Sequence, residues 1–514
     1  MLPRPHSVPC LLPALLLAAF GCQRQEPPGA APEPSAAPAR VAAPSSAAPV
    51  EGQPSAGAAP GSIDDNLPFV GGSTKLASIA WRTWVYTDIG PKRWRYGYIR
   101  AGEVFDVRGP PIVNDGCAGG WYRVNPRGFV CAGKGATLEL SDPVAQAASA
   151  RPVRGQGLPY LYAMSSEAPP FLYFRVPKTS EMKTVEGDGI TGYVARWRER
   201  IAAQGLRELI GEPGEAPDFL RDGRALKKPY GVKQGLHFAT HAGRASADSG
   251  FAIARVFAAE GRVFGLTTEL DLIALDRTEI VRPSSFHGVE LAEGEDLPVA
   301  FVKQHYAGRH ALDDRGQLRA DGSFRYREPL KLTGNKRAGD LLETRDNAWV
   351  AGSATRILDK RTSFPSFATG DRKWIDISIN DQSLIAYVGT HAVYATLVST
   401  GRGGLGDPEK AQATVRGTFM VYQKHISSTM DGEDDKVSDS FNLQDVPFVQ
   451  YFHKGFALHG TYWHDEFGKI RSHGCVNLAP IDAAWLFEWT DPNVPPGWHG
   501  ALNKDRGTVV YIHP

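Results

Sequence analysis

The C-terminal part of the chain alternates apolar and polar side chains with a period of two, and this pattern constrains the fold more than any other feature. Trp374–Ile379 alternates in this way, which predicts a half-buried strand. Ser383–Val388 and Ala392–Ser399 are apolar and β-branched enough for buried strands. Asn380–Gln382, between the first two, is rich in turn-forming residues. We therefore expect a strand-rich domain over residues 372–514.

Glycine and proline divide much of the remaining sequence into short strand-like runs. The chain has 55 Gly and 38 Pro among 514 residues, and they interrupt each run. Five such runs predict a small β-barrel over residues 66–145: Ser78–Val85, Trp94–Arg100, Val104–Val107, Trp121–Val124 and Gly128–Cys131. Similar runs between Phe324 and Ala351 predict a second small barrel over residues 301–360.

Helical periodicity is rare in this chain. Thr191–Ile210 has apolar residues at helical spacing, and Ile481–Trp489 follows Pro480, which favours a helix start. Residues 150–300 otherwise contain short strand-like runs, so we expect a mixed α/β or mostly β module of no assigned role. The predicted class is a mostly β, multidomain protein.

The N-terminus has the pattern of an export signal. Leu11–Phe20 is an apolar run of about ten residues, too short to span a bilayer, so residues 1–21 fit a secretory signal peptide. Ala19–Cys22 resembles a bacterial lipobox, which implies lipidation of Cys22. Ordinary secretion without lipidation remains the alternative. Either way, we expect an exported protein of the periplasm or cell envelope.

Residues 22–65 have the composition of a disordered tether. Of the 36 residues in Glu26–Gly61, 29 are Ala, Pro, Ser or Gly, which cannot bury enough apolar area to offset chain entropy. Proline-rich chains extend at about 3.1 Å per residue, so the tether reaches on the order of 100 Å. A spacer of required length and a spacer of no required length both fit.

Overall charge argues against one class of function. The chain has 57 Lys and Arg against 56 Asp and Glu, a formal net charge of +1. Binders of nucleic acids and other polyanions normally carry a basic surplus. The chain-wide charge therefore gives no support to such a binder, and we expect no nucleic-acid partner.

The cysteines agree with an oxidising compartment. Cys10 lies in the predicted signal and Cys22 is the candidate lipid site. Cys117 and Cys131 flank a short segment and are expected to form a disulfide, worth about 3 kcal/mol in the entropic model. Cys475 is then the odd cysteine of an exported chain, which points to a reactive thiol.

Two short segments carry the candidate chemistry. Ala457–Thr461 contains His459, and Arg471–Leu478 contains Cys475. A nearby imidazole makes a thiolate available near neutral pH. Gly474 allows a tight turn and exposes backbone amides that can stabilise an oxyanion. The pattern predicts a cysteine nucleophile with a histidine base.

His459-Gly460 followed by Ser472-His473-Gly474-Cys475-Val476-Asn477 resembles the signature of the L,D-transpeptidases, which have a YkuD-type catalytic domain. The resemblance covers roughly residues 372–514. Val415 stands where many members have the proline of a Thr-Pro-x-Gly turn. The resemblance implies cysteine acyl transfer on peptidoglycan, with no metal and no organic cofactor.

The resemblance also implies a role for each matching residue. Cys475 is the nucleophile, His459 is the proton donor and acceptor, and the Gly460 carbonyl orients His459. The Gly474 amide, with that of Cys475, stabilises the oxyanion. The resemblance also implies that His473 and Ser472 line the pocket and that Asn477 fixes the loop.

The implied reaction begins when Cys475 attacks the carbonyl between the third residue and the fourth, D-Ala, of a stem tetrapeptide. D-Ala leaves, and an amine of a second stem, or of an outer-membrane or wall-linked protein, resolves the thioester. Two alternatives remain: an L,D-carboxypeptidase or endopeptidase that uses water, and a non-catalytic wall-binding lipoprotein. Catalysis requires that the thiol be reachable from solvent.

The predicted small barrels also resemble known modules. Trp121–Val124 with Gly128–Val130 resembles bacterial SH3-like wall-binding modules, and Asn347–Val350 is similar to a second such strand pair. The resemblance implies that these modules hold glycan or stem peptides, which would raise the local substrate concentration. Expected partners are thus peptidoglycan and, through a lipid anchor, a membrane.

Other patterns are weaker. His459, His464, His473 and Cys475 are suitable zinc ligands, but their spacing lacks the usual paired geometry. Gly401–Gly406 satisfies Gly-x-Gly-x-x-Gly without a following helix, so a glycine turn is expected. His237 and His241 lack the glutamate of a zinc protease, and Asp431–Asp435 lacks calcium-loop spacing.

Overall fold

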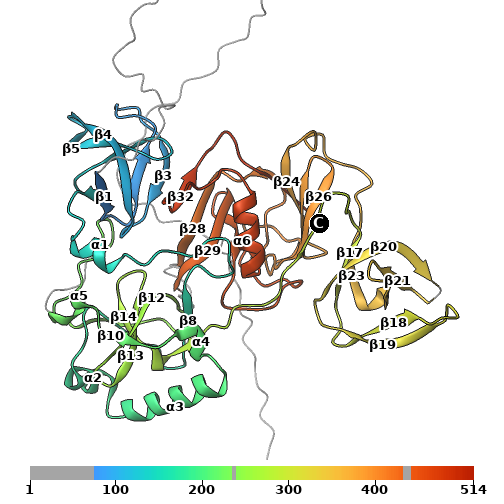
Figure 1. The fold of residues 1–514 in the computed structure, drawn as a ribbon, viewed down its shortest axis with the longest axis horizontal. Coiled ribbons are helices and arrows are strands. Elements are labelled where there is room, and N and C mark those ends of the chain that lie inside the picture. Colours follow the sequence, from blue (N-terminus) through green and yellow to red (C-terminus); the bar gives the residue numbers. More distant parts are fainter. Residues whose placement is uncertain (1–73, 234–238, 338, 432–441) are drawn as a thin grey trace, which may run out of the picture.

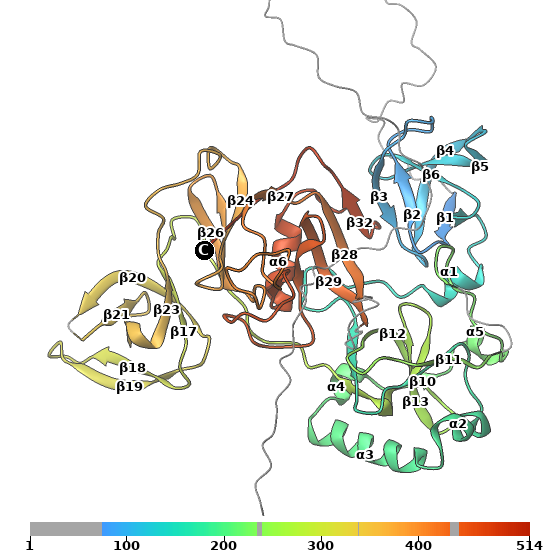
Figure 2. The ribbon, with the colours of Figure 1, turned by 180° about the vertical axis from the view of Figure 1, so that it is seen from behind.

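The computed structural model describes residues 74–233, 239–337, 339–431 and 442–514. The predicted signal peptide, tether and Cys22 lie outside these ranges. The C-terminal domain occupies the centre, with the N-terminal module on one side and the module of residues 299–358 on the other (Figures 1 and 2). In the described part of the chain, no helix is both long enough and apolar enough to cross a bilayer.

The first sheet of the C-terminal domain has the strand order β16-β26-β25-β24-β33-β27. Its strands are β16 (Val289–Glu290), β24 (Lys373–Ser378), β25 (Ser383–Val388), β26 (His391–Leu397), β27 (Gly417–Met420) and β33 (Val509–His513). Both faces are buried: Ile375 and Ile377 point into one apolar cluster, whereas Trp374 belongs to another. The three strands predicted at 374–399 are confirmed, with the turn between the first two.

The second group of strands in this domain pairs in the order β32-β28-β29-β30-β31. These are β28 (Gln423–Asp431), β29 (Asn442–His453), β30 (Phe456–Gly460), β31 (Val476–Leu478) and β32 (Gly500–Leu502). The predicted helix is present as α6 (Pro480–Trp489) and packs against β29 and β30. Its buried Asp482 accepts hydrogen bonds from the Gly288 amide and the Tyr394 hydroxyl, both at 2.7 Å.

The N-terminal module consists of seven strands and one short helix. They are β1 (Lys75–Ser78), β2 (Thr83–Tyr86), β3 (Arg95–Ile99), β4 (Val104–Asn114), β5 (Cys117–Val124), β6 (Phe129–Cys131), β7 (Ala136–Thr137) and α1 (Pro143–Ala147). The prediction of a single strand at 78–85 is wrong, because a turn separates β1 from β2. The hydroxyls of Ser78 and Thr83 form a hydrogen bond of 2.7 Å across this turn. A disulfide joins Cys117 and Cys131.

The middle module mixes helices and strands. Its strands are β8 (Leu161–Ser165), β9 (Phe171–Tyr173), β10 (Gly214–Glu215), β11 (His241–Arg244), β12 (Gly250–Ala259), β13 (Arg262–Thr267), β14 (Leu272–Ala274) and β15 (Thr278–Ile280). Its helices are α2 (Thr179–Glu186), α3 (Ile190–Ala203), α4 (Arg207–Ile210) and α5 (Asp218–Arg221). The helix predicted at 191–210 is broken into α3 and α4, because Gly205 adopts φ +61°.

The module of residues 299–358 is a separate seven-stranded sheet of order β19-β18-β22-β21-β20-β17-β23. Its strands are β17 (Val299–Val302), β18 (Ala307–Leu312), β19 (Leu318–Phe324), β20 (Pro329–Arg337), β21 (Leu341–Thr344), β22 (Trp349–Ala351) and β23 (Thr355–Leu358). The protein is thus mostly β and has several modules, as predicted. The likeness of either flanking module to SH3 domains remains a prediction.

Candidate active site

The parallel pairing of β30 with β31 brings His459 and Cys475 to the same side of one sheet. Leu458 is in register with Val476, and His459 with Asn477. Leu458 and Val476 point into the domain core. Because side chains alternate along a strand, His459 projects from the opposite face, and so does Cys475, which directly precedes Val476.

His459 is held in one orientation by its own backbone neighbour. Its Nδ1 lies 2.9 Å from the Gly460 carbonyl oxygen. A carbonyl only accepts, so Nδ1 carries the proton and Nε2 is left as the basic nitrogen. Burial lowers the pKa of His459 to about 4, partly offset by this hydrogen bond. The imidazole is therefore neutral at pH 7 and able to accept a proton.

Hydroxyl groups fix the turn before Cys475. The Gly474 N–H donates to Ser472 Oγ at 3.0 Å, and the Ser472 hydroxyl donates to the Cys475 carbonyl. The Thr414 hydroxyl donates to the Gly474 carbonyl at 2.8 Å and accepts from the Gly401 amide at 2.9 Å. Gly474 itself adopts φ +134°, a region that favours glycine.

These bonds alter two expectations from the sequence. The Gly474 amide, expected at the oxyanion, instead donates to Ser472, because the tight turn places that hydroxyl beside it. Ser472 therefore shapes the turn. Thr414 was not identified as a site residue, although the Thr-x-x-Gly pattern that contains it was available in the sequence. Its hydroxyl connects the turn to the Gly401 segment.

Asn477 fixes the loops around the site. Its backbone exchanges two hydrogen bonds with Ser399, both at 2.9 Å, and its side-chain amide lies 2.9 Å from His464 Nε2. Burial lowers the pKa of His464 to about 4. His473 is half-buried beside the turn. In the described ranges, no three His, Cys, Asp or Glu residues are grouped as metal ligands would be.

Cys475 is buried, contrary to the expectation of a reachable thiol. Only 3% of the residue is exposed, as for His459. It belongs to an apolar cluster that includes Leu443, Val446 and Val449 of β29 and also Tyr462. Packing of this cluster, to which the middle module contributes Tyr162, is the physical reason for the burial.

The middle module contacts the site region directly. Tyr162 on β8 stacks on Tyr462 with ring centroids 4.2 Å apart, and its hydroxyl donates to the Asp445 carbonyl at 2.6 Å. Gly250 of β12 pairs with Leu443 of β29 in parallel register. The module assigned no role from sequence thus packs on the strand next to the one that carries His459.

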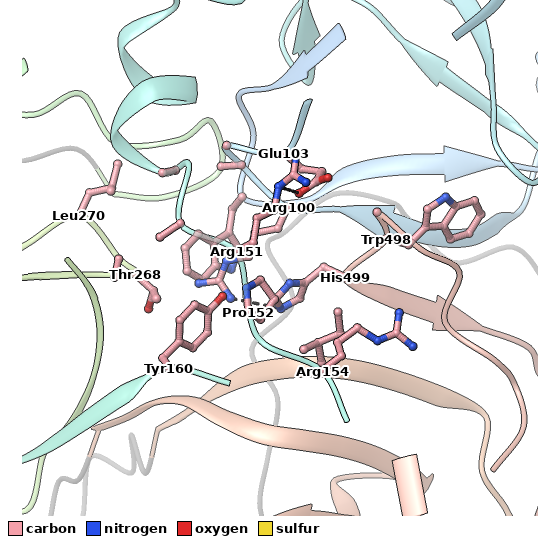
Figure 3. Close-up of a pocket in the computed structure, with 18 of the residues that line it drawn as sticks. Arg100, Glu103, Arg151, Pro152, Arg154, Tyr160, Thr268, Leu270, Trp498 and His499 are labelled. Carbon is pink, nitrogen blue, oxygen red and sulfur yellow. Dashed lines mark hydrogen bonds and ion pairs between the residues drawn. The ribbon is translucent and has the colours of Figure 1, made fainter. Parts of the chain in front are cut away.

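The N-terminal module meets the same strand through a buried ion pair. Arg100 pairs with Asp445 of β29, and one of its bonds, Nη2 to Oδ2, is 2.8 Å long. A cavity of about 410 Å³ lies beside this pair, where three modules meet, and Arg100, Tyr160 and His499 are among its lining residues (Figure 3). Neither Cys475 nor His459 lines this cavity.

Other sequence patterns have structural explanations. Gly401–Gly406 forms consecutive tight turns, with the Gly404 and Gly406 amides bonded to the Gly401 and Gly403 carbonyls. His241 packs against Phe171 with ring centroids 4.8 Å apart. His237 and residues 432–435 of the acidic segment lie outside the described ranges.

Comparison with known proteins finds matches to the C-terminal domain. Residues 372–512 match the family model described as the L,D-transpeptidase catalytic domain, YkuD. A putative L,D-transpeptidase, YciB, of Bacillus subtilis (strain 168) is 28% identical over 133 residues, which are 24% of this chain and 61% of that protein. The chain therefore spans about three fifths of the length of this relative.

Two solved structures illustrate the structural matches. A cysteine-to-serine mutant of an Enterococcus faecium L,D-transpeptidase is 19% identical, with 30% of this chain and 55% of that chain covered and a TM-score of 0.22. A Mycobacterium smegmatis L,D-transpeptidase is 17% identical, with 46% and 89% covered and a TM-score of 0.22. At such TM-scores these matches support no inference of their own.

Proposed function

We propose that this protein is a peptidoglycan L,D-transpeptidase. The proposal is supported by the match of residues 372–512 to the model of the L,D-transpeptidase catalytic domain, a family of cysteine acyltransferases. The family acts on peptidoglycan stem peptides. The donor is a stem tetrapeptide, and the products are a cross-linked or protein-linked stem and free D-Ala. The acceptor is an amine of a second stem or of an envelope protein.

In the proposed mechanism, His459 Nε2 removes the proton of the Cys475 thiol. The thiolate attacks the carbonyl that precedes D-Ala, and the tetrahedral oxyanion collapses as the C–N bond breaks. His459 returns its proton to the departing amine of D-Ala, which leaves a thioester on Cys475. The acceptor amine then attacks the thioester, His459 takes the amine's proton, and that proton restores the thiol.

The single observation that carries this proposal is the register of β30 and β31, with the Gly460 carbonyl bonded to His459 Nδ1. The register puts both side chains on one face, and the hydrogen bond leaves Nε2 as the base. In this proposal, the amides of Gly474 and Cys475 stabilise the oxyanion. The Gly474 amide must then release its hydrogen bond to Ser472 and donate to the substrate instead.

The decisive test is incubation of the purified protein with disaccharide-tetrapeptide, followed by mass spectrometry. We expect cross-linked dimers and free D-Ala, and we expect Cys475→Ala to abolish both these products and the covalent adduct. Cys475→Ser is the matched control for packing. Trimmed stems without dimers would instead establish the hydrolase alternative, and an adduct on Cys475→Ala would refute the nucleophile.

The pH dependence tests the base. Burial lowers the pKa of His459 to about 4, so the imidazole is neutral and basic down to that pH. We expect the acid limb of the acylation rate near pH 4, well below the usual histidine range near 6.5. Rates of adduct formation between pH 3 and 8 would measure it, with the melting temperature as a control for unfolding. A limb at pH 6.5 would contradict the buried base.

A second function, a non-catalytic wall-binding protein, is favoured by one observation, the 3% exposure of Cys475. The two are separated by labelling with a small thiol reagent in the native protein and in urea. The enzyme proposal expects native labelling of Cys475 that the stem tetrapeptide competes against. Labelling in urea alone, together with no product from tetrapeptide, would establish the binding protein.

We further propose that the protein works outside the cytoplasm, held by a lipid on Cys22, with residues 22–65 as its tether. Mass analysis of the mature N-terminus, in the wild type and in Cys22→Ala, tests this anchor. A diacylated Cys22 is the expected result, whereas a cleaved, unmodified N-terminus would leave ordinary secretion.

A further inference from the structure

The near-neutral chain contains a strongly basic module. Between Lys75 and Thr137 there are ten Lys and Arg but only four Asp and Glu. Seven of these basic residues have no carboxylate within 4 Å among the described residues, namely Arg82, Lys92, Arg93, Arg95, Arg123, Arg127 and Lys134. Chain-wide charge therefore hides a local surplus that a polyanion could neutralise.

Strand register places two of these arginines, Arg95 and Arg123, on one side of the module. Arg123 of β5 is opposite Phe129 of β6, Phe129 is opposite Tyr86 of β2, and Tyr86 is opposite Arg95 of β3. Directly opposite residues project from the same face of a sheet. Trp84, two residues before Tyr86, projects there too.

Four arginines of the module, these two included, lie over aromatic rings of this face. Arg95 lies 4.1 Å from the Trp84 ring centroid, and Arg82 lies 5.4 Å from that of Tyr98. The matching distances are 5.1 Å for Arg93 over Tyr86 and 5.8 Å for Arg123 over Phe129. We call Arg82, Arg93, Arg95 and Arg123 the arginine face.

Stacking leaves these guanidinium groups ready for an anion. A ring under the guanidinium plane restricts its orientation, and a carboxylate would bind the Nη groups at the outer end. In Arg93, Nη1 already donates to the Gly90 carbonyl at 2.9 Å. The Nε atoms of Arg82, Arg93 and Arg123 are buried and have no hydrogen-bond partner in the described structure. The ring contacts thus orient the guanidinium groups before any ligand binds, and these Nε atoms use no hydrogen bond to the protein for this.

Several arginines that line the cavity or stack on rings elsewhere are paired with carboxylates of the protein itself. At the cavity of Figure 3, Arg100, Arg151 and Arg154 pair with Asp445, Glu103 and Glu488. In the module of residues 299–358, Arg309 and Arg327 stack on rings but pair with Asp321 and Asp465, respectively. Arg337 of the same module stacks on Trp349. Within the described ranges, the arginine face therefore brings four stacked guanidinium groups together without a paired carboxylate, whereas stacked arginines such as Arg244 and Arg337 lie singly.

We propose that the arginine face binds the free carboxylates of peptidoglycan stem peptides. This inference rests on the proposed function, because the same polymer would supply substrate and ligand. Planar guanidinium groups match carboxylates in two-point hydrogen bonds. Several weak contacts along one polymer add up to tight attachment and raise the local substrate concentration at the catalytic domain.

The test is binding of the full soluble chain to isolated wall sacculi. The variant R82Q/R93Q/R95Q/R123Q is expected to bind roughly 10- to 100-fold more weakly, since each exposed pair contributes modestly, and its binding should depend less on salt. The control K303Q/R315Q/R325Q/K336Q removes the same charge from the module of residues 299–358 and should bind like the wild type. Equal losses in both variants would overturn a dedicated face.

Two further arms make the outcome decisive. Sacculi whose carboxyls are methyl-esterified should lose binding to the wild type, and phosphatidylglycerol vesicles should not replace them. Retained binding to esterified sacculi, or a preference for the vesicles, would overturn the carboxylate assignment. Replacing the four arginines by lysine keeps the charge, so full wild-type binding by that variant would overturn the need for the guanidinium group. Circular dichroism melting confirms that each variant is folded.

A soluble assay separates this inference from the proposed function. The glutamine variant should cross-link disaccharide-tetrapeptide at the wild-type rate, because none of the four arginines belongs to the active site. Arginine-dependent sacculus binding by a chain that forms no acyl adduct would support the face and refute the enzyme. If the chain forms the acyl adduct but its sacculus binding does not depend on the four arginines, the enzyme proposal is supported and the arginine face is refuted.

Discussion

The N-terminal module and the module of residues 299–358 flank the same C-terminal domain but join it in different ways (Figure 1). In the N-terminal module, β3 pairs with β32 through Gly97 and Ala501, and Arg100 forms a buried pair with Asp445. The other module forms its own sheet, and its ion pair joins Arg327 to Asp465, which is 54% exposed.

The difference shows that two mostly β modules of similar size are not equivalent attachments. Val85 and Ile99 of the N-terminal module share one apolar core with Ile375 of the catalytic domain. The module of residues 299–358 also packs β17 against the catalytic domain, through Val299 and Phe301, but most of its core is its own. Backbone pairing and a desolvated ion pair fix orientation, whereas an exposed pair adds little.

The largest expected effect tests the buried pair. Asp445→Asn should lower the free energy of unfolding by about 3–5 kcal/mol, because it leaves the Arg100 guanidinium buried without its counter-charge. Urea unfolding followed by circular dichroism measures the loss. The double variant R100M/D445N should recover part of it, since neither charge remains buried. A loss below about 1 kcal/mol in D445N would erase the contrast between the modules.

An intermediate effect tests the strand junction. A Cβ on Gly97 would lie 2.1 Å from the Gly500 carbonyl oxygen of β32. Gly97→Ala should therefore force the strands apart and cost about 1–3 kcal/mol. Gly308→Ala is the matched control in the other module, because its nearest contact is the movable His310 ring at 3.1 Å. Equal melting temperatures for the two variants would contradict the tight junction.

The smallest effect concerns the exposed pair. Asp465→Asn should change the free energy of unfolding by less than about 1 kcal/mol, because solvent screens the pair with Arg327. The same urea titration that is used for Asp445→Asn gives a direct comparison. A loss as large as that of D445N would mean that the module of residues 299–358 is held as firmly as the N-terminal one.

Strand positions were largely predictable, because alternation and turn residues act locally. The strands and turn at 374–399 and the helix at 480–489 appear as expected. Errors arose where a single residue broke a continuous pattern. The turn between Ser78 and Thr83 divides one apolar run into two strands, and the positive φ of Gly205 ends a helix that its neighbours favour.

The candidate site could be proposed from the sequence, but its surroundings could not. His459, Gly460 and Cys475 are candidates because the proposed chemistry requires those residue types in a short motif, and their roles stay predictions. The use of the Gly474 amide by Ser472 and the burial of Cys475 were not, since both depend on partners fixed by the folded chain.

The sequence by itself determined which residues are the candidate nucleophile and base and that the chain is rich in strands, because local pattern and side-chain chemistry are properties of the residues. Only the tertiary structure decided how those residues meet. The pairing of Arg100 with Asp445 joins positions 345 residues apart, and the register of β30 with β31 depends on how the two strands meet in the folded sheet. Such contacts follow from the packing of whole sheets, which no local pattern encodes.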